Sequence, residues 1–339
     1  MNPKKIFFLD AGRKYFSPDS VKKLLDAVSR AGLDTMELYF SDNQGFRFAL
    51  NDMTLNTAWG SYDLTPALGD GYVQEGKAPD GSSRYWTEAD VDEILNYAES
   101  LNIRIIPALN MPGHMGAILE HFPHLRYPGS HSSIDLRSAE ARAFAHEILR
   151  KYAAWFAQRG CDFFNFGADE FANDLGVMGF EEIYKNGIMQ QFVDFINELV
   201  ETVTGLGLVP MAFNDGICYN NDSRTYGMID NRLWVQHWTV GWNGYSPASP
   251  VTLANLGYHL VNTNQEYYII LGRCDYAERA QKAGQFQFSV YEGGVEAPET
   301  AAAMLCCWCD FANEFGTDDG AALTQLLPPA IEAFGLALK

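Results

Sequence analysis

A single-domain (β/α)8 TIM barrel is the fold that the sequence predicts for residues 1–339. Short apolar segments alternate with amphipathic segments along the chain, and no low-complexity stretch or linker divides it. Strands that alternate with helices form parallel βα units, and eight such units are typical of a closed barrel. The predicted strands are Lys5–Asp10, Thr35–Phe40, Ile103–Leu109, Asp162–Phe166, Val209–Phe213, Arg232–His237, His259–Asn264 and Ala303–Trp308.

Two of the segments between the strands carry clear helix signals. Ser17 precedes Pro18, a pair typical of an N-cap and a first helical residue, and Gly32 stands where this helix would end. Thr87 and Asp90 resemble a capping box in which Asp replaces the usual Glu or Gln. Apolar residues follow both starts at helical spacing, so we predict an amphipathic helix in each segment.

The segment Asn51–Tyr85 lacks a strong period and is rich in Gly and Asp. We therefore predict a long loop after the second strand. Loops of this length in compact domains often carry function.

The charge balance limits the classes of partner. The 339 residues include 43 acidic and 24 basic residues, for a formal net charge of −19. An acidic surface repels phosphate groups, so nucleic acids and anionic membranes are disfavoured as partners, whereas a neutral sugar is not. No apolar run approaches the roughly 20 residues of a membrane span. Homo-oligomerisation stays open.

The first residues and the cysteines predict the compartment. The apolar run Ile6–Leu9 is too short for the core of a signal peptide. Several cysteines lie inside apolar runs and none has the paired spacing of a zinc site, so we expect reduced, buried thiols and a cytoplasmic location. A secreted chain trimmed of its signal peptide would have the same sequence. The cysteines are Cys161, Cys218, Cys274, Cys306, Cys307 and Cys309.

Polar or aromatic residues follow nearly every predicted strand. In a barrel, active sites lie at the carboxyl ends of the strands, so these residues are the candidates for a site. A purely structural barrel has no need for polar groups at every strand end. The candidates are Asp10, Arg13, Asp42, Asn43, Arg47, Asn110, His114, Asp169, Glu170, Asn214, Asp215, His237, Trp238, Asn262 to Tyr268, Trp308 and Asp310.

Adjacent carboxylates at Asp169 and Glu170 leave the fourth predicted strand. They point in different directions, so their surroundings can separate their pKa values and leave one as an acid and the other as an anion. Acidic residues that cap a helix would give the same pair. His114 within reach of Asp42 and Glu170 would tune a proton donor, whereas alone it would be an ordinary turn histidine. A metal site is disfavoured, because no ligand spacing recurs among these residues.

Aromatic side chains gather near the predicted strand ends. Their rings stack on the apolar faces of sugars and present polar edges as well, although core packing is the commoner fate of a tryptophan. Asp310 beside one of them would be a buried charge unless it met solvent or a ligand. These aromatic residues are Trp238, Trp242, Trp308, Tyr267 and Tyr268.

Taken together, the motifs resemble the catalytic barrel of glycoside hydrolase family 20, in the branch of bacterial exo-hexosaminidases and lacto-N-biosidases. The resemblance runs over nearly the whole chain, and its motifs stand in the family's order at the strand ends. They are Asp10-Ala11-Gly12-Arg13-Lys14-Tyr15, Asp42-Asn43-Gln44-Gly45-Phe46-Arg47-Phe48, Pro112-Gly113-His114-Met115, Phe164-Asn165-Phe166-Gly167-Ala168-Asp169-Glu170, Met211-Ala212-Phe213-Asn214-Asp215-Gly216, Asn262-Thr263-Asn264 through Tyr268-Ile269-Ile270-Leu271-Gly272, and Trp308-Cys309-Asp310.

The resemblance implies a retaining hydrolysis in which the substrate's acetamido oxygen attacks its own anomeric carbon. It assigns Glu170 as the acid and then the base, and Asp169 as the acceptor of the acetamido N–H. Tyr268 would donate to the acetamido oxygen, and Asp42 with His114 would form a relay behind Glu170. No metal ion or cofactor is implied.

The resemblance also implies a set of sugar-binding residues. Arg13 and Asp310 would bind hydroxyls, and Trp238 and Trp308 would wall the pocket. Many family members carry an acid where this chain has Ile270, so that hydroxyl contact is absent here. Of Tyr267 and Tyr268, strand alternation lets only one face the pocket. The further predicted binding residues are Asn214, Tyr267 and Trp242.

The sequence is compatible with three functions. The first is an exo-β-N-acetylhexosaminidase that removes a terminal GlcNAc or GalNAc from a glycan. The second is a lacto-N-biosidase-type enzyme that releases a disaccharide, with Asn51–Tyr85 and Trp242 shaping a longer pocket. The third is a glycan-binding barrel without catalysis, which the predicted proton donor disfavours because binding alone does not need one.

Overall fold

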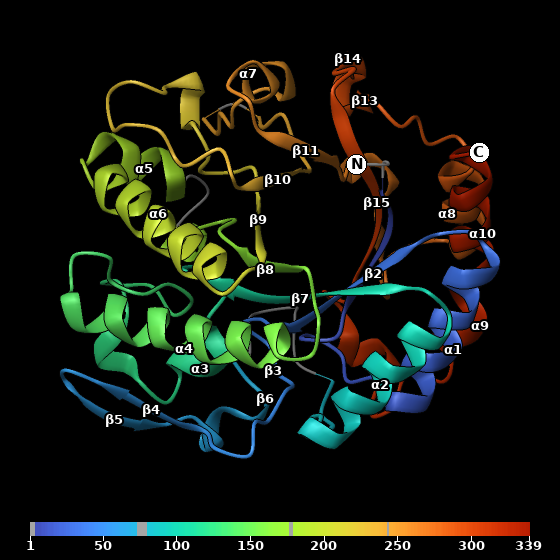
Figure 1. Ribbon diagram of the computed structural model, residues 1–339, viewed down its shortest axis with the longest axis horizontal. Helices are drawn as coiled ribbons and strands as arrows, with labels where there is room; N and C mark the ends of the chain where they lie inside the picture. The colour runs from blue at the N-terminus through green and yellow to red at the C-terminus, as the bar shows by residue number, and fades with distance from the viewer. Residues whose placement is uncertain (1–3, 73–79, 176–178, 243) are drawn as a thin grey trace.

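The computed structural model describes residues 4–72, 80–175, 179–242 and 244–339. Its centre is a closed barrel of parallel strands in which β1 pairs with both β15 and β2 (Figure 1). This confirms the predicted (β/α)8 fold, and each predicted strand overlaps an observed one. In order around the barrel, the strands are β1 (Lys4–Asp10), β2 (Thr35–Ser41), β7 (Arg104–Met111), β8 (Phe163–Gly167), β9 (Val209–Phe213), β10 (Trp234–His237), β11 (His259–Asn262) and β15 (Thr300–Trp308).

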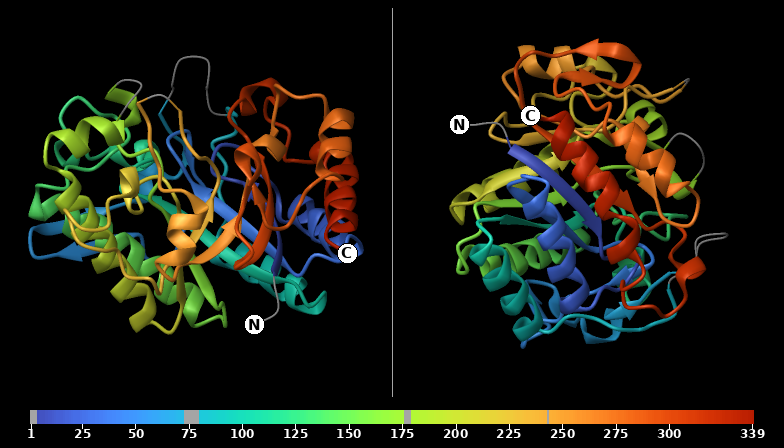
Figure 2. Two further views of the ribbon diagram at one scale, coloured as in Figure 1. Left: turned by 90° about the horizontal axis from the view of Figure 1, so that it is seen from above. Right: turned by 90° about the vertical axis from the view of Figure 1, so that its right-hand side faces the viewer.

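Helices cover the outside of the barrel. The last of them, α10, packs beside α1, so the last helix of the chain lies next to the first in the outer layer (Figure 2). The connection from β9 to β10 holds a 3-10 turn at Tyr219–Asn221 and no α-helix. The α-helices are α1 (Pro18–Arg30), α2 (Glu88–Ser100), α3 (Gly116–Leu119), α4 (Ala139–Ala157), α5 (Gly179–Lys185), α6 (Met189–Gly205), α7 (Pro250–Asn255), α8 (Tyr276–Ala283), α9 (Leu323–Leu326) and α10 (Pro328–Ala337).

Both predicted helix starts are confirmed. The Ser17 side chain accepts the backbone N–H of Ser20, and Pro18 opens α1. Thr87 and Asp90 form a reciprocal capping box at the start of α2. Asp has one methylene less than Glu, yet it still reaches the backbone N–H of Thr87 at 2.8 Å.

The prediction of a loop over Asn51–Tyr85 is wrong for part of the segment. Strands β4 (Thr54–Thr57) and β5 (Gly60–Asp63) form an antiparallel hairpin below α4 (Figure 1). Leu55 and Tyr62 face inward, and the Tyr62 hydroxyl donates to Glu140 of α4 at 2.8 Å. Each strand is only four residues long, which is too short for alternation to stand out in the sequence. Residues 73–79 of the predicted loop lie outside the described residues.

Short strands within the loops extend the sheet near its carboxyl end. Strands β3 and β6 continue from β2, and β12 pairs with the end of β15. Their bounds, with those of the remaining hairpin, are β3 (Gly45–Phe46), β6 (Gly69–Asp70), β12 (Ile269–Ile270), β13 (Val290–Tyr291) and β14 (Val295–Glu296).

The core has two parts, one between the sheet and the helices and one inside the barrel. The inner part is aromatic beneath the carboxyl ends of the strands. There, the rings of Phe8 and Trp308 lie 4.4 Å apart, and Tyr39 and Phe213 pack against the same tryptophan. Such ring pairs contribute about 0.5–1.5 kcal/mol each beyond their area burial. The barrel is therefore filled by side chains up to the level of the loops.

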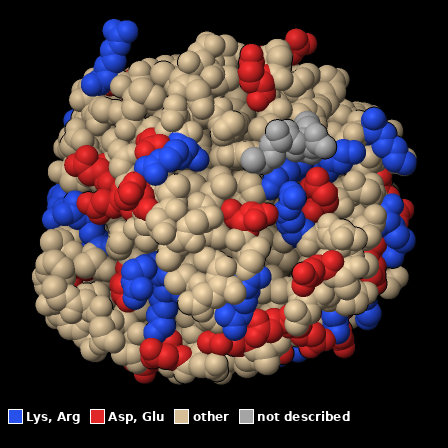
Figure 3. Space-filling view, in the orientation of Figure 1, with Lys and Arg blue, Asp and Glu red and all other residues tan. Residues whose placement is uncertain are grey.

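On the face seen in Figure 3, basic side chains lie among acidic ones. The described part of the chain holds no helix with the length and apolar character needed to cross a bilayer.

Candidate active site

A cavity of about 210 Å³ opens at the carboxyl ends of the barrel strands. Its walls combine charged, aromatic and apolar groups from the last residues of β9 and β15 and from the loops that follow β1, β7, β8, β10, β11 and β15. This volume is below the roughly 300–1,000 Å³ of pockets that hold drug-sized ligands, so it suits one small ligand. The lining residues are Arg13, His114, Asp169, Glu170, Phe213, Trp238, Gln265, Tyr268, Ile270, Trp308 and Asp310.

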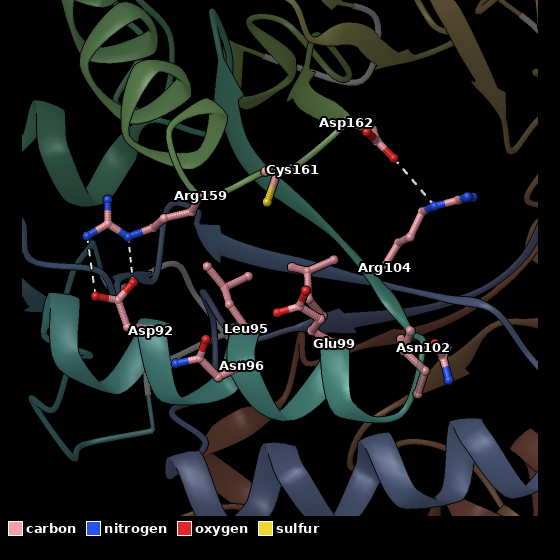
Figure 4. A pocket seen from close by; sticks show the side chains of 12 residues that line it. Asp92, Leu95, Asn96, Glu99, Asn102, Arg104, Arg159, Cys161 and Asp162 are labelled. Carbon is pink, nitrogen blue, oxygen red and sulfur yellow. Dashed lines mark hydrogen bonds and ion pairs between the residues drawn. The ribbon is translucent and has the colours of Figure 1, made fainter.

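A larger cavity of about 600 Å³ lies at the other end of the barrel, beside α2 (Figure 4). Four of its charged groups form pairs: Arg159 lies 2.5 Å from Asp92, and Arg104 lies 3.4 Å from Asp162. Barrel enzymes place their chemistry at the opposite, carboxyl end. The smaller cavity is therefore the candidate active site.

The backbone after β8 turns sharply so that Asp169 and Glu170 face the cavity. Gly167, Ala168 and Glu170 have φ values of +74°, +65° and +47°. A Cβ on Gly167 would lie 1.8 Å from Oδ1 of Asn110, so only glycine fits there. Positive φ at non-glycine residues is strained, and such strain concentrates at functional sites.

Asp42, His114 and Glu170 form a continuous chain of contacts. Oδ2 of Asp42 lies 3.1 Å from Nδ1 of His114, and Nε2 of His114 lies 3.2 Å from Oε2 of Glu170. Burial opposes a charged imidazole, but the carboxylates of Asp169 and Asp42 outweigh it and raise the pKa of His114 well above its usual value. The ring is therefore a cation that faces Glu170.

Arg13 supplies a second buried cation on the same side. Its guanidinium pairs with Asp10 at 2.8 Å and with Asp42 at 3.1 Å, and it lies over the ring of Trp308. Burial alone would raise the pKa of Asp42, but Arg13 and His114 hold it well below its usual range. We call Arg13, Asp42 and His114 the charged half of the site.

Asp169 is buried beside Asn110, a strand-end candidate without a predicted role, and a hydrogen bond connects Asn110 to Tyr39, which was not among the candidates. Asn110 donates to Asp169 Oδ1 at 2.6 Å and to the hydroxyl of Tyr39 at 3.0 Å, and Tyr39 in turn donates to Asp42 at 2.7 Å. Burial raises the pKa of Asp169, while His114 and Asn110 act in the opposite direction. Asn110 was visible as a strand-end residue, whereas Tyr39 lies within β2 and had no such signal.

Tyr268 lines the cavity with a buried hydroxyl. Among the described residues, that hydroxyl makes no hydrogen bond of normal geometry, although the side chains of Thr263 and Trp308 lie nearby. Burial raises the pKa of Tyr268 well above its usual value, so the hydroxyl keeps its proton. A buried donor on a residue that lines a cavity is suited to a ligand acceptor.

On the other side of Glu170, Asp215 accepts three hydrogen bonds, which come from the turn after β8 and the loop after β10. The donors are the backbone N–H of Glu170 at 3.0 Å, the indole Nε1 of Trp238 and the hydroxyl of Tyr245. We call Asp215, Trp238 and Tyr245 the neutral half of the site, because these three donors to the carboxylate are uncharged. Asp215 follows β9 and was visible in the sequence, but only its contacts distinguish it from a turn residue.

Three of the predicted binding residues do not line the cavity. Asn214 is buried and bridges the loop after β10, accepting from Trp238 N and donating to Thr239 O. The ring of Tyr267 packs on Phe286 outside the cavity. Trp242 stacks on Tyr245 at 4.6 Å, with its centroid 6.4 Å from that of Trp238, and 43% of its surface is exposed.

Three further residues complete the cavity wall. Phe213 points inward from the end of β9, and Gln265 donates to Thr239 and Glu292. Ile270 in β12 lies beside Trp308 through pairing with β15, so this wall is apolar. The inward alternation of Met211 and Phe213 was a usable sequence signal for Phe213.

Comparison with known proteins agrees with this architecture. The sequence matches the family described as glycosyl hydrolase family 20, catalytic domain, over residues 5–301. A structure of the tandem GH20 catalytic modules of the pneumococcal exo-β-D-N-acetylglucosaminidase superposes with a TM-score of 0.85 at 30% identity, covering 99% of this chain and 83% of that chain. Dispersin B has a TM-score of 0.75 at 20% identity, covering 98% of each chain, and so shares the fold.

Two curated relatives extend well beyond the matched region. A β-hexosaminidase of Vibrio vulnificus is 24% identical over 318 residues, covering 77% of this chain and 36% of the relative. A lacto-N-biosidase of Bifidobacterium bifidum is 24% identical over 198 residues, covering 54% of this chain and 17% of the relative. The chain thus spans about a third or less of the length of these relatives. The family match over most of the chain nevertheless places it: this protein belongs to glycosyl hydrolase family 20.

Proposed function

We propose that this protein is a retaining exo-β-N-acetylhexosaminidase, which removes a terminal β-GlcNAc or β-GalNAc from a glycan by substrate-assisted catalysis. The observation that carries the proposal is the position of Glu170. Its carboxyl group lines a small cavity and contacts a buried histidine cation, beside a second carboxyl group and a buried tyrosine hydroxyl.

Glu170 moves the proton in this mechanism. It protonates the leaving glycosidic oxygen and then, as a carboxylate, takes a proton from the attacking water. The imidazolium of His114 contacts Oε2 and stabilises the carboxylate that forms after the first step. Asp42 and Arg13 hold that imidazolium in place.

Asp169 and Tyr268 act on the acetamido group. Asp169 accepts the acetamido N–H and stabilises the positive charge that develops on the oxazolinium, while Tyr268 donates to the acetamido oxygen. An internal nucleophile held in position gains from proximity, because its orientation is set before reaction. Trp238 and Trp308 enclose this group with aromatic faces.

The exo mode is supported by the shape and lining of the cavity. Its volume suits a single sugar ring, and Arg13 and Asp310 offer polar groups for sugar hydroxyls. A glycan chain would therefore enter with its non-reducing end only. A binding protein without catalysis would need the aromatic walls but no cationic contact to a proton donor.

A disaccharide-releasing enzyme is the second candidate, and one observation favours it. A further cavity of about 340 Å³ shares Arg13, His114 and Glu170 with the first and is otherwise polar. An additional sugar on the terminal residue would need such a neighbouring space. Its other lining residues are Asp42, Asn43, Gln44, Tyr72, Ser132, Asn173 and Asp174.

Turnover of 4-nitrophenyl β-glycosides tests the proposal. We expect release from β-GlcNAc or β-GalNAc and strong inhibition by a GlcNAc-thiazoline, which mimics the oxazolinium. Release from the lacto-N-bioside alone would instead support the second candidate. Binding of sugars without turnover of any of these substrates would contradict both.

A further inference from the structure

The carboxylate of Asp215 joins parts of the site that are far apart in the sequence. It is fully buried, and its donors come from the turn after β8, at Glu170, and from the loop that connects β10 to α7, at Trp238 and Tyr245. Trp238 is a wall of the cavity, and Glu170 is its acid. The Asp215 side chain therefore holds both Trp238 and Glu170 in place relative to the end of β9.

The two oxygens of this carboxylate have separate tasks. Oδ1 accepts the indole N–H of Trp238, whereas Oδ2 accepts the backbone N–H of Glu170 and the hydroxyl of Tyr245. Glu170 has φ of +47°, a conformation that a non-glycine residue rarely adopts without an anchor. The bond from its N–H to Asp215 is such an anchor.

The location of this carboxylate carries an electrostatic cost. Burial and the nearby Asp169 raise the pKa of Asp215 to about 7, with Glu170 acting in the same direction and Tyr245 in the opposite one. A buried acid beside two others is costly, and its hydrogen bonds offset that cost only in part. A role confined to packing would be met by a neutral side chain, so the geometry points to positioning.

We propose that Asp215 is a positioning residue for the reaction: it fixes the Trp238 wall of the acetamido pocket and the backbone of the acid Glu170 in one mutual arrangement. The inference rests on the proposed hexosaminidase function. It assigns Asp215 no contact with substrate, and it makes the placement of the acid and of the acetamido wall depend on the same group.

Asp215→Asn is a sharp probe because it preserves shape and removes one acceptor. If the amide nitrogen takes the Oδ1 place, it opposes the indole N–H of Trp238. If it takes the Oδ2 place, it opposes the backbone N–H of Glu170. The hydroxyl of Tyr245 can rotate to accept, so Asn disturbs the wall or the acid and spares Tyr245.

The experiment compares kcat/KM of wild type and D215N on aryl β-GlcNAc substrates with good and poor leaving groups. A misplaced acid matters more when the leaving oxygen needs a proton. We expect a loss of about 10²-fold on the poorest leaving group, as for a misplacement near 1 Å, and a clearly smaller loss on 2,4-dinitrophenol. We also expect weaker inhibition by GlcNAc-thiazoline, which reports on the Trp238 wall.

Two variants serve as controls. Asp222 likewise accepts from a tyrosine hydroxyl, that of Tyr184, and from two backbone N–H groups, but it lies outside the cavity lining. D222N should leave the leaving-group dependence and the thiazoline affinity unchanged. Tyr245→Phe keeps both N–H contacts of Asp215 and should lose less activity than D215N.

The outcomes separate this inference from the proposed function. If folded D215N, judged by its circular dichroism and unfolding midpoint, loses activity equally on all leaving groups or not at all, the positioning role is overturned. If D215N is poorly folded, the leaving-group comparison is made on Trp238→Phe, which lacks the indole donor to Asp215. Loss of the wall alone lowers activity on all leaving groups alike, so an equal loss on all of them overturns the role, whereas a greater loss on the poorest leaving group supports it. A wild type that cleaves no β-hexosaminide would instead refute the function.

Discussion

Asp42 and Asp215 are two buried aspartates connected to the same acid, and their surroundings are opposite. Asp42 meets the cations of Arg13 and His114, which hold its pKa well below its usual range despite burial. Asp215 meets neutral donors and lies near two other acids, so burial and Asp169 raise its pKa to about 7. The chemical type of a buried residue therefore does not decide its charge, whereas its partners do.

Because of this difference, the two halves of the site have separate roles. The charged half holds fixed charges next to the side chain of Glu170, where a proton is moved. The neutral half holds the backbone of Glu170 and the wall beside it, where position matters. Glu170 is where the halves meet, through its side chain to His114 and its N–H to Asp215.

The largest expected effect comes from removing the group at which the halves meet. Glu170→Gln keeps the backbone contact to Asp215 but cannot move the proton. We expect kcat on substrates with poor leaving groups to fall by about 10²- to 10⁴-fold. The exposed Glu99→Gln in α2 is the control for the same chemical change. Near-normal turnover in a folded E170Q protein would remove Glu170 from its role.

The adjacent residues Tyr267 and Tyr268 test which of the two side chains belongs to the cavity wall. Tyr268→Phe deletes the buried hydroxyl in the cavity, and we expect kcat/KM to fall by about 10²- to 10³-fold, as for loss of one preorganised donor. Tyr267→Phe deletes a hydroxyl that donates to Gln285 O at 3.3 Å outside the cavity, and we expect a loss below about twofold in the absence of a transition-state contact. A larger loss in Y267F than in Y268F would contradict this placement.

The two aspartates should also differ in stability. Asp42→Asn leaves two buried cations with one anion less, and we expect the free energy of unfolding to fall by about 3–5 kcal/mol. Asp215→Asn leaves one neutral donor unsatisfied, for a fall of about 1–3 kcal/mol. Urea denaturation of both variants at pH 7 measures the difference. Equal losses, or a greater loss in D215N, would argue against the division into halves.

The last expected effect is a pH dependence of stability in the neutral half. The pKa of Asp215 is raised from 3.8 to about 7, so between these values the folded chain binds a proton that the unfolded chain has released. Stability from this group is full below pH 4 and declines as pH rises to 7. The stability advantage of wild type over D215N should shrink over that interval. An advantage that is constant from pH 4 to pH 8 would contradict the raised pKa.

Much of the site could be predicted because it follows the periodicity of the barrel. Short apolar strands at regular intervals predict parallel βα units, and the carboxyl ends of those units necessarily converge. Arg13, His114, Asp169, Glu170 and Trp308 each stand at such an end, and the structure brings all of them to one cavity.

Other features depend on local geometry that sequence spacing does not carry. The β4–β5 hairpin is built from four-residue strands, too short for alternation to be visible. Tyr267 and Tyr268 are adjacent, and only the turn that precedes β12 decides which ring enters the cavity. Trp242 stands near the site in sequence, yet it stacks on Tyr245 outside the cavity lining.

By itself, the sequence determined the barrel, the end of it that holds the chemistry, and the identity of the adjacent acids. Only the tertiary structure decided what surrounds each acid. Asp42 and Asp215 each follow a strand, but the loops that meet at their carboxylates come from distant parts of the chain. The charge of a buried group depends on those neighbours through desolvation and Coulomb energy, which act through space and not along the sequence.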